Sequence, residues 1–122
     1  MVNNRQSEKR YDLEDRTLAF AKRVRALVKT LPKGQGNFED CKQLIRSSGS
    51  VGANYIEANE ALSKKDFLMR AKICPKEAKE SAYWLKLVYV RDDANIESVR
   101  MGLQTEAVEL TSIFGAIVTK SE

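Results

Sequence analysis

The chain has 122 residues, of which 43% are hydrophobic and 31% are charged, and it carries a net charge of +4. This length suits a single domain, and this composition is rich enough to bury a core, which excludes a disordered chain. Histidine is absent, which excludes the usual serine and cysteine triads and most zinc sites, and no apolar run approaches the ~20 residues of a membrane span.

Residues 1–11 are polar and predict a flexible N-terminal arm, followed by one helical bundle domain over residues 12–122. From Leu13 onward, apolar side chains recur at alternating spacings of four and three, which is typical of an amphipathic helix. This stripe consists of Leu13, Thr17, Phe20, Val24, Leu27 and Leu31. Pro32 and Gly34 then end the helix, and Asn37 is predicted to be the N-cap of the next one.

A second helix is predicted over about residues 38–59, with two neighbouring apolar rows. The main row is Cys41, Leu44, Ser48, Val51, Tyr55 and Ala58, and the second is Phe38, Ile45 and Gly52. Residues 47–53 are almost all small, and each glycine among them costs a helix about 1 kcal/mol relative to alanine. We therefore expect neighbouring helices to approach this helix closely.

The third helix is predicted to begin after Ser63, whose hydroxyl can cap it together with Asp66. Its stripe consists of Phe67, Ala71, Cys74, Ala78, Ser81, Leu85 and Val88. Pro75 interrupts this pattern, and an interior proline costs about 3 kcal/mol because it removes a backbone hydrogen bond and clashes with the preceding turn. Because the stripe keeps its phase, we expect a kink near residues 71–75 and not a break.

A turn over residues 91–95 leads into a fourth helix. Its stripe consists of Ile96, Val99, Leu103, Ala107, Leu110, Phe114 and Ile117. Four amphipathic helices joined by short loops are typical of an up-down-up-down arrangement. The predicted fold class is therefore all-α, an antiparallel four-helix bundle.

No pattern in the sequence predicts a catalytic site, a metal or a cofactor. Four glutamates on the middle helices invite a di-iron interpretation, but such bundles use Glu-x-x-His pairs and this chain has no histidine. Cys41 and Cys74 lie within amphipathic patterns, so we expect two reduced, buried thiols and a cytoplasmic protein. The predicted function is non-enzymatic.

Basic side chains gather on one side of two helices. On the first helix they are Lys22, Arg25, Lys29 and Lys33, and on the third they are Lys65, Lys72, Lys76, Lys79 and Lys86. One interpretation is an ordinary solvated face. The other, which two such rows favour, is a surface that binds the phosphates of RNA or DNA with little sequence specificity.

A second set of apolar residues lies away from the main stripes. Ile73, Trp84 and Leu87 belong to the third helix, and Met101 and Val108 to the fourth. An isolated bundle needs one apolar stripe per helix, so a second one indicates either a widened core or a contact with another subunit. We favour self-association, because soluble proteins commonly form closed homo-oligomers.

The helix 2–3 region resembles the 23S rRNA intervening-sequence protein family. The stretches that carry this resemblance are residues 50–58 (SVGANYIEA), 63–67 (SKKDF), 76–81 (KEAKES), 83–85 (YWL) and 109–114 (ELTSIF). The resemblance extends over about residues 13–120. Arg46, Asn54 and Glu57 match recurrent family positions, and we interpret them as buried polar residues that hold helices or subunits in register.

The resemblance implies a bacterial four-helix bundle that assembles as a homopentamer and has no established activity. It also implies a relationship to the accessory protein of diversity-generating retroelements, a basic pentamer that binds nucleic acid and a reverse transcriptase. The resulting hypothesis is a homo-oligomer that binds RNA or DNA through the basic faces of its first and third helices. The alternative is a protein-interaction scaffold without nucleic-acid binding.

Overall fold

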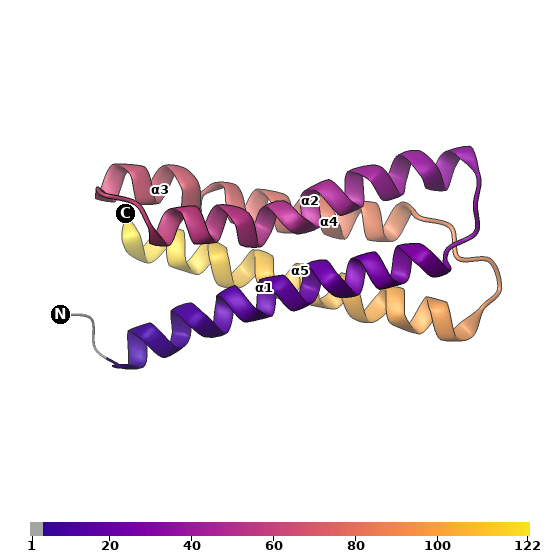
Figure 1. The fold of residues 1–122 in the computed structure, drawn as a ribbon, viewed down its shortest axis with the longest axis horizontal. Coiled ribbons are helices and arrows are strands. Elements are labelled where there is room, and N and C mark those ends of the chain that lie inside the picture. The colour runs from indigo at the N-terminus through magenta and orange to yellow at the C-terminus, as the bar shows by residue number, and fades with distance from the viewer. Residues whose placement is uncertain (1–3) are drawn as a thin grey trace.

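The apolar stripes of the sequence form helices whose buried faces meet in one core. The computed structural model describes residues 4–122, with side chains from Asp12 onward. Its helices are α1 (Asn4–Thr30), α2 (Gln35–Asn59), α3 (Lys64–Ala71), α4 (Ile73–Leu87) and α5 (Ala94–Ser121). Lys72 alone separates α3 from α4, so the two segments form one kinked helix and the architecture is a four-helix bundle (Figure 1).

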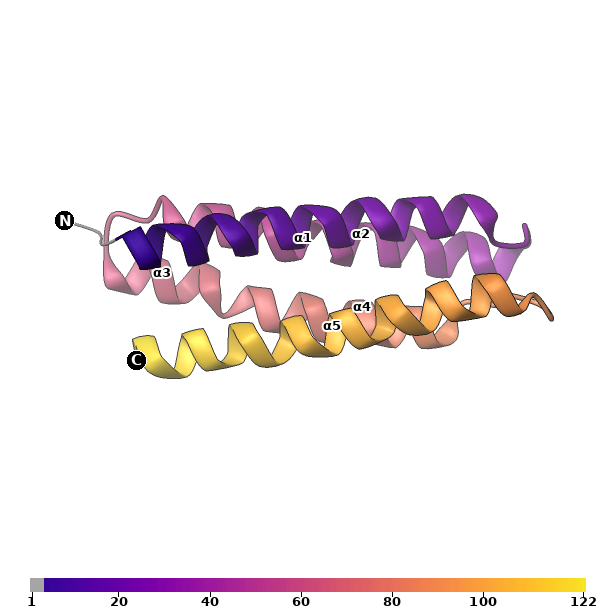
Figure 2. The ribbon, with the colours of Figure 1, turned by 90° about the horizontal axis from the view of Figure 1, so that it is seen from below.

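The helices lie around the bundle in chain order. α1 packs against α2 and α5, and α4 packs against the same two helices. In the described part of the chain, α1 and α4 make no close backbone contact, so they occupy diagonal corners. Figure 2 shows α1 and α2 as one layer and α4 and α5 as the other. This is the predicted up-down-up-down topology.

The predicted stripes supply nearly all of the core. The fully buried large side chains include Phe20, Val24, Leu44, Val51, Leu85, Leu103, Leu110 and Phe114. At the centre, the rings of Tyr55 and Phe114 meet edge to face with centroids 5.1 Å apart. Two stripe residues are exposed: Phe38 at 66%, and Val99 at 47%, which lines a shallow groove between α5 and α1 beside the small Ala26.

The kink predicted near Pro75 is confirmed. The helix is interrupted at Lys72, whose backbone angles (φ −65°, ψ −23°) remain in the right-handed helical region. Pro75 has no N–H to offer the carbonyl of Ala71 four residues earlier, so the hydrogen-bond ladder fails there. Ala71, Cys74 and Ala78 are all buried, because the apolar face continues across the kink.

α1 begins earlier than the apolar stripe indicates. Its backbone is helical from Asn4, whereas the prediction placed the helix start at Leu13. Polar residues 4–11 therefore extend α1 as a helix instead of forming an open coil. Residues 1–3 lie outside the described part of the chain, and the flexibility predicted for the arm over residues 1–11 stays a prediction.

Asn37 is not the N-cap of α2, which is a correction to the prediction. The helix starts at Gln35 after Gly34, and the first backbone bond runs from the N–H of Phe38 to the carbonyl of Gly34 at 2.8 Å. Asn37 is buried in the first turn, and its Nδ2 donates to the carbonyls of Pro32 (2.9 Å) and Tyr89 (2.8 Å). Its Oδ1 accepts from the N–H of Tyr89 at 2.8 Å. The side chain thus links two loops at one end of the bundle.

Two other helix starts follow simple capping rules. The Ser63 hydroxyl accepts a hydrogen bond from the N–H of Asp66 at 3.1 Å, which confirms the predicted cap of α3. The Asp93 carboxylate accepts from the N–H groups of Asn95 and Ile96, both at 3.0 Å. These caps fix the residues at which α3 and α5 begin.

The small residues of α2 allow the close approach that the sequence predicts. A Cβ atom added to Gly52 would lie 2.7 Å from Oγ1 of Thr17, which is itself buried in α1. At Gly49 the added atom would lie 3.6 Å from the Arg25 guanidinium, which crosses from α1 over this position. α1 can therefore pack directly on the backbone of α2.

Candidate nucleic-acid interface

The outer face of α4 and the kink before it carry a compact group of basic side chains. Lys72, Lys76, Lys79 and Lys86 are all exposed, and their spacing of four, three and seven residues places them on one side of the helix. From Lys72 to Lys86 the row spans about 21 Å at the usual rise of ~1.5 Å per residue. We call this row, with Tyr83 among it, the α4 outer face.

Acidic side chains of α4 are turned away from this face. Glu77 and Glu80 lie on the α2 side, where Arg46 of α2 pairs with both of them, at 3.3 Å in the case of Glu77. Because Arg46 neutralises one of these two negative charges and both carboxylates lie on the α2 side, they reduce the positive potential of the lysine row only in part. One acid does reach the row, since Glu122 lies 3.9 Å from Lys72, but both groups are exposed and such a pair contributes little.

Tyr83 is the residue that sequence reasoning missed in this face. It is 58% exposed and lies among Lys76, Lys79 and Lys86 on the outward side of α4. Its ring meets the Trp84 ring edge to face at a centroid distance of 5.1 Å, which holds it in place. The helical spacing of Tyr83 relative to the lysines was the available signal. An exposed aromatic ring among lysines is an arrangement that can stack on an unpaired base.

The remaining predicted basic residues are spread over other surfaces. Lys65 is exposed on α3, on the far side of the kink from most of the α4 outer face. Lys22, Arg25 and Lys29 are exposed on α1, which lies diagonally opposite α4. The two predicted rows therefore do not form one continuous surface within a single chain.

Arg25 is also less free than the other cations of the α1 row. Its Nη1 donates to the carbonyl of Ala21 at 3.2 Å, and its guanidinium lies over Gly49. The α1 row borders the space between α1 and α2, where Lys22 and Arg25 line a cavity. The α1 row therefore lies at the edge of a cavity between two helices, whereas the α4 outer face is turned to solvent.

The two predicted interface rows lie in different places. Trp84 lies on the same side of α4 as Glu77 and Glu80, facing α2, and it packs partly against the core, as the widened-core alternative expects. Leu87 is exposed and Ile73 is half-buried. On α5, Met101 and Val108 are exposed, and both remain available for a contact with another molecule.

The polar trio of Arg46, Asn54 and Glu57 does not form a buried cluster within a single chain, and its predicted role between subunits stays a prediction. Arg46 is half-exposed and holds α2 to α4 through Glu77 and Glu80. Asn54 bonds within its own helix, donating to the Ser50 carbonyl at 2.9 Å. Glu57 is exposed. Polar side chains of α2 that point outward were assigned to the interior because spacing alone does not show which neighbour each side meets.

The cysteines lie in apolar surroundings. Cys41 and Cys74 are both buried as free thiols. Burial raises the pKa of the Cys74 thiol to about 12 and also raises the pKa of Cys41, so both stay protonated. Among the side chains that the structure describes, from Asp12 onward, no cluster of Cys, Asp or Glu is arranged to hold a metal ion.

Comparison with models of known protein families identifies the family of this chain. The model of the 23S rRNA-intervening sequence protein family matches residues 9–114. The chain belongs to this family. The match confirms the resemblance seen in the stretches between residues 50 and 114, and the family description names no enzymatic activity. The further relationship to the accessory protein of diversity-generating retroelements stays a prediction.

A solved structure supports both the fold and the assignment. A protein of unknown function from the S23 ribosomal protein family of Bacteroides thetaiotaomicron is 33% identical in sequence, with a TM-score of 0.73. The match covers 86% of this chain and 96% of that one. None of the curated protein sequences matches the chain. In the described part of this chain, no helix combines the length and apolarity needed to cross a membrane.

Proposed function

We propose that this family member is a non-enzymatic, homo-oligomeric bundle that binds RNA or DNA through the α4 outer face. The observation that carries the proposal is the separation of charge on α4. Its lysines face solvent together, whereas Glu77 and Glu80 face α2 and are paired with Arg46. A nucleic-acid backbone approaching this side would meet cations with little competing negative charge.

The expected mechanism is phosphate contact with a stacking component. A row of about 21 Å is long enough to follow roughly six nucleotides of one strand, at ~3.4 Å per nucleotide. Tyr83, exposed within this row, can stack on a base that is not paired. Binding should therefore favour RNA with single-stranded loops over perfect duplexes, with weak dependence on sequence.

Oligomerisation is part of the proposal because several weak binding surfaces in one assembly bind a nucleic acid more tightly than one surface alone. Four lysines on one chain give modest affinity at physiological salt, but several copies bound to one nucleic acid act together. Exposed apolar side chains such as Met101, Val108 and Leu87 support self-association. The homopentamer is the assembly that the family resemblance implies.

The test is a fluorescence-anisotropy titration of a loop-containing RNA and a duplex DNA across a salt series. The variant K72E/K76E/K79E should lose at least about a hundredfold in affinity at low salt, and the log–log salt slope should fall by about three contacts. The matched control K22E/K29E/K33E changes the net charge equally, on α1 and in the loop that follows it, and should retain most of the binding. Unchanged binding by the α4 variant would show that this face is not the interface.

A second variant separates stacking from charge. Replacing Tyr83 with serine removes an exposed ring and should weaken binding to the loop-containing RNA by about tenfold, since stacking contributes about 1–3 kcal/mol per base. Duplex DNA binding should be almost unaffected, because paired bases are not available to the ring. Equal effects on both ligands would contradict a stacking role for Tyr83.

A further inference from the structure

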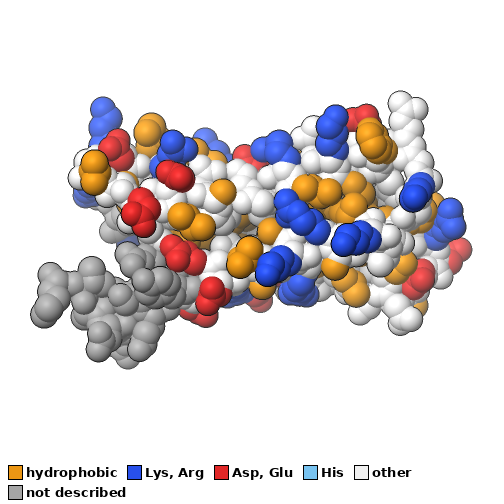
Figure 3. Space-filling model, viewed as in Figure 1, with side chains coloured by type: hydrophobic (Ala, Val, Ile, Leu, Met, Phe, Trp, Pro, Cys, Tyr) orange, Lys and Arg blue, Asp and Glu red, His pale blue; other side chains and the backbone are white. Residues whose placement is uncertain are grey.

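A long apolar groove runs between α1 and α2 on the face shown in Figure 3. Two cavities lie along it, one of about 520 Å³ near the α1–α2 loop and one of about 360 Å³ nearer the middle of the helices. We call this feature the α1–α2 groove. Its apolar lining consists mainly of Leu18, Ala21, Val28, Phe38, Ile45 and Ile56.

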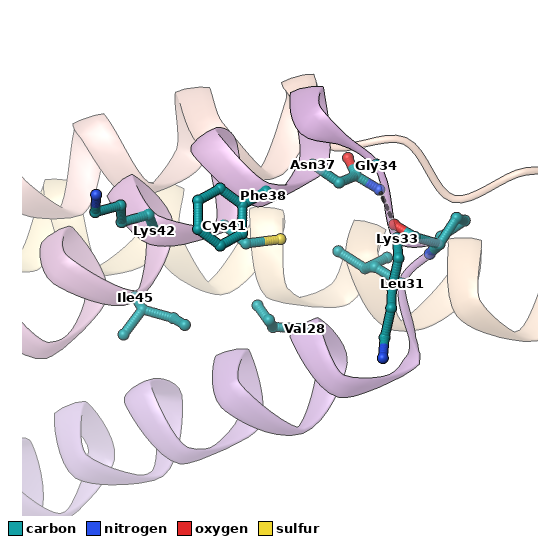
Figure 4. A pocket seen from close by; sticks show the side chains of 10 residues that line it. Val28, Leu31, Lys33, Gly34, Asn37, Phe38, Cys41, Lys42 and Ile45 are labelled. Carbon is teal, nitrogen blue, oxygen red and sulfur yellow. Dashed lines mark hydrogen bonds between the residues drawn. The ribbon is translucent and has the colours of Figure 1, made fainter.

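Several of these side chains are left in solvent at a high cost for an isolated chain. Phe38 is 66% exposed, Leu18 is 54% exposed and Ile56 is 48% exposed. Figure 4 shows Phe38 standing beside the opening near Cys41, with Val28 and Ile45 facing the same space from α1 and α2. An apolar lining with exposed large side chains is typical of a binding surface. The Arg25 guanidinium, which lies over Gly49, marks the end of the middle cavity that faces the cavity near the loop.

The groove is elongated, which favours an elongated occupant. From Leu18 to Leu31 the α1 wall spans about 20 Å at ~1.5 Å per residue, enough for roughly four turns of a helix. A small molecule would fill one cavity and leave the other open. A helix that carries apolar side chains at three- and four-residue intervals would fill both cavities at once.

The charged rim of the groove indicates what kind of helix fits. Lys22 and Arg25 line the middle cavity, and Lys33 and Lys42 line the cavity near the loop. Figure 3 shows basic side chains beside the apolar patch, whereas acidic side chains on this face are most frequent toward the end of the molecule where the N-terminus lies. Glu14 is the acid that lines the groove, and it accepts a hydrogen bond from Asn59 at 3.2 Å.

Helices α4 and α5 of a second copy would present acids that the chain already uses in its own ion pairs. On α4, Glu77 and Glu80 bind Arg46, and on α5, Glu106 and Glu109 bind Arg16. A partner helix with free carboxylates would break no such pair, and a second copy is the alternative occupant in the test below.

We propose that the α1–α2 groove binds an amphipathic helical segment of a partner protein, with acidic residues flanking its apolar stripe. The apolar side chains of that segment would cover Leu18, Phe38 and Ile56. Its carboxylates would lie against Lys22, Arg25, Lys33 and Lys42. This surface is separate from the α4 outer face, so one molecule could hold a protein on one side and a nucleic acid on another.

The probe is a labelled synthetic helical peptide of about five turns, with leucines at i, i+3, i+4 and i+7 and glutamates beside them. One control peptide replaces every glutamate with lysine, and another keeps the composition but scrambles the leucine spacing. The full chain should bind the first peptide saturably, and the controls at least about tenfold more weakly. Hydrogen exchange should slow in α1 and α2 and not on the outer side of α4.

Variants of exposed residues locate the site without threatening the fold. The variants F38S/I56S and K22E/K42E should each lower the affinity for the peptide by at least about tenfold. Met69 and Lys65 provide controls of the same residue chemistry at a single site each, because both are exposed on α3, away from the groove. The variants M69S and K65E should bind the peptide as the unaltered chain does.

Three results would overturn the proposal. The first is the absence of saturable peptide binding, or equal binding of the lysine peptide. The second is an oligomer that dissociates in F38S/I56S, which would show that a second copy fills the groove. The third is a K22E/K42E variant that loses affinity for RNA but still binds the peptide. That result would show that the cations at the rim of the groove contact phosphates. The α4 variant K72E/K76E/K79E should keep the peptide, so failure of the nucleic-acid proposal is distinguishable.

Discussion

At the scale of single residues, Gly52 and Thr17 set the distance between α1 and α2. The Thr17 hydroxyl is buried and already donates to backbone oxygens of its own helix, including that of Leu13 at 2.8 Å. It therefore has little freedom to move away from a new atom. The absence of a side chain at Gly52 is what lets the two backbones approach.

Replacing Gly52 with alanine should destabilise the protein even though alanine is the better helix former. The gain in helix propensity is about 1 kcal/mol, but overpacking a buried contact costs about 1–3 kcal/mol. We expect a net loss of about 1 kcal/mol, measured by chemical denaturation. The matched control is Gly115→Ala, because nothing lies within 4 Å of its added Cβ. That variant should be more stable than the original, and a stabilised G52A would show that the helices separate freely.

Asn37 shows why one residue assignment could not come from sequence. An asparagine after a Gly-rich loop is a common N-cap, and the pattern offered no reason to place it inside the helix. Its three hydrogen bonds involve Pro32 and Tyr89, and Tyr89 is far along the chain. Only the packed structure shows that the amide connects both loops. A local rule could not anticipate a non-local partner.

At the scale of helices, Arg16 joins α1 to α5. Its guanidinium donates to Glu106 through Nε at 2.8 Å and Nη2 at 2.7 Å, and to Glu109 at 2.8 Å. These hydrogen bonds lower the pKa of Glu106 below its ordinary value and raise the pKa of Arg16. A bidentate pair of this kind holds the two helices in a defined register.

The ion pair predicts an acid-dependent stability. Because the pKa of Glu106 is lower in the folded state, the unfolded chain binds more protons in the acid range, and stability falls as pH decreases. The contribution should be complete above about pH 4.5, near the pKa of an unperturbed glutamate, and be lost below it. Glu106→Gln should lower the free energy of unfolding by about 1 kcal/mol at pH 7. Its melting temperature should also fall less than that of the unaltered chain when the pH is lowered through the acid range.

The control for this prediction is Glu109→Gln, whose side chain is 57% exposed against 16% for Glu106. Its loss should be smaller, since an exposed pair contributes little. If both variants follow the unaltered chain at every pH, Arg16 does not stabilise the α1–α5 contact.

The helices and their buried faces were predictable from the sequence. Which helices are neighbours, and therefore what the other faces meet, was not. Apolar spacing identified nearly every core position and the kink at Pro75, because burial imposes a period on each helix. A helical wheel gives the angle of a side chain but not the neighbour that it meets. The diagonal placement of α1 and α4, and the pairing of Arg46 with Glu77 and Glu80, depend on which helices are adjacent. Tyr83 is different, because its helical spacing relative to the lysines already places it on the α4 outer face.

At the scale of the whole molecule, the exposed apolar side chains of α5 predict assembly. Light scattering at micromolar concentration should return a mass several times that of one chain. Val108→Glu should reduce that mass, because a carboxylate is costly to bury in an apolar contact. Leu62→Glu is the control, since Leu62 is almost fully exposed in the loop before α3. A single-chain mass for the unaltered protein would show that these residues serve another purpose.

The two buried thiols give the molecule a pair of internal reporters. Cys41 lies near the α1–α2 loop, and Cys74 lies beside the kink between α3 and α4. Thiol reagents attack thiolates, so neither sulfur should react while its surroundings stay closed. The labelling rate of each cysteine therefore measures how often its own region opens. Comparing the two rates under mild denaturant would show whether the bundle loosens first at its loop or at its kink.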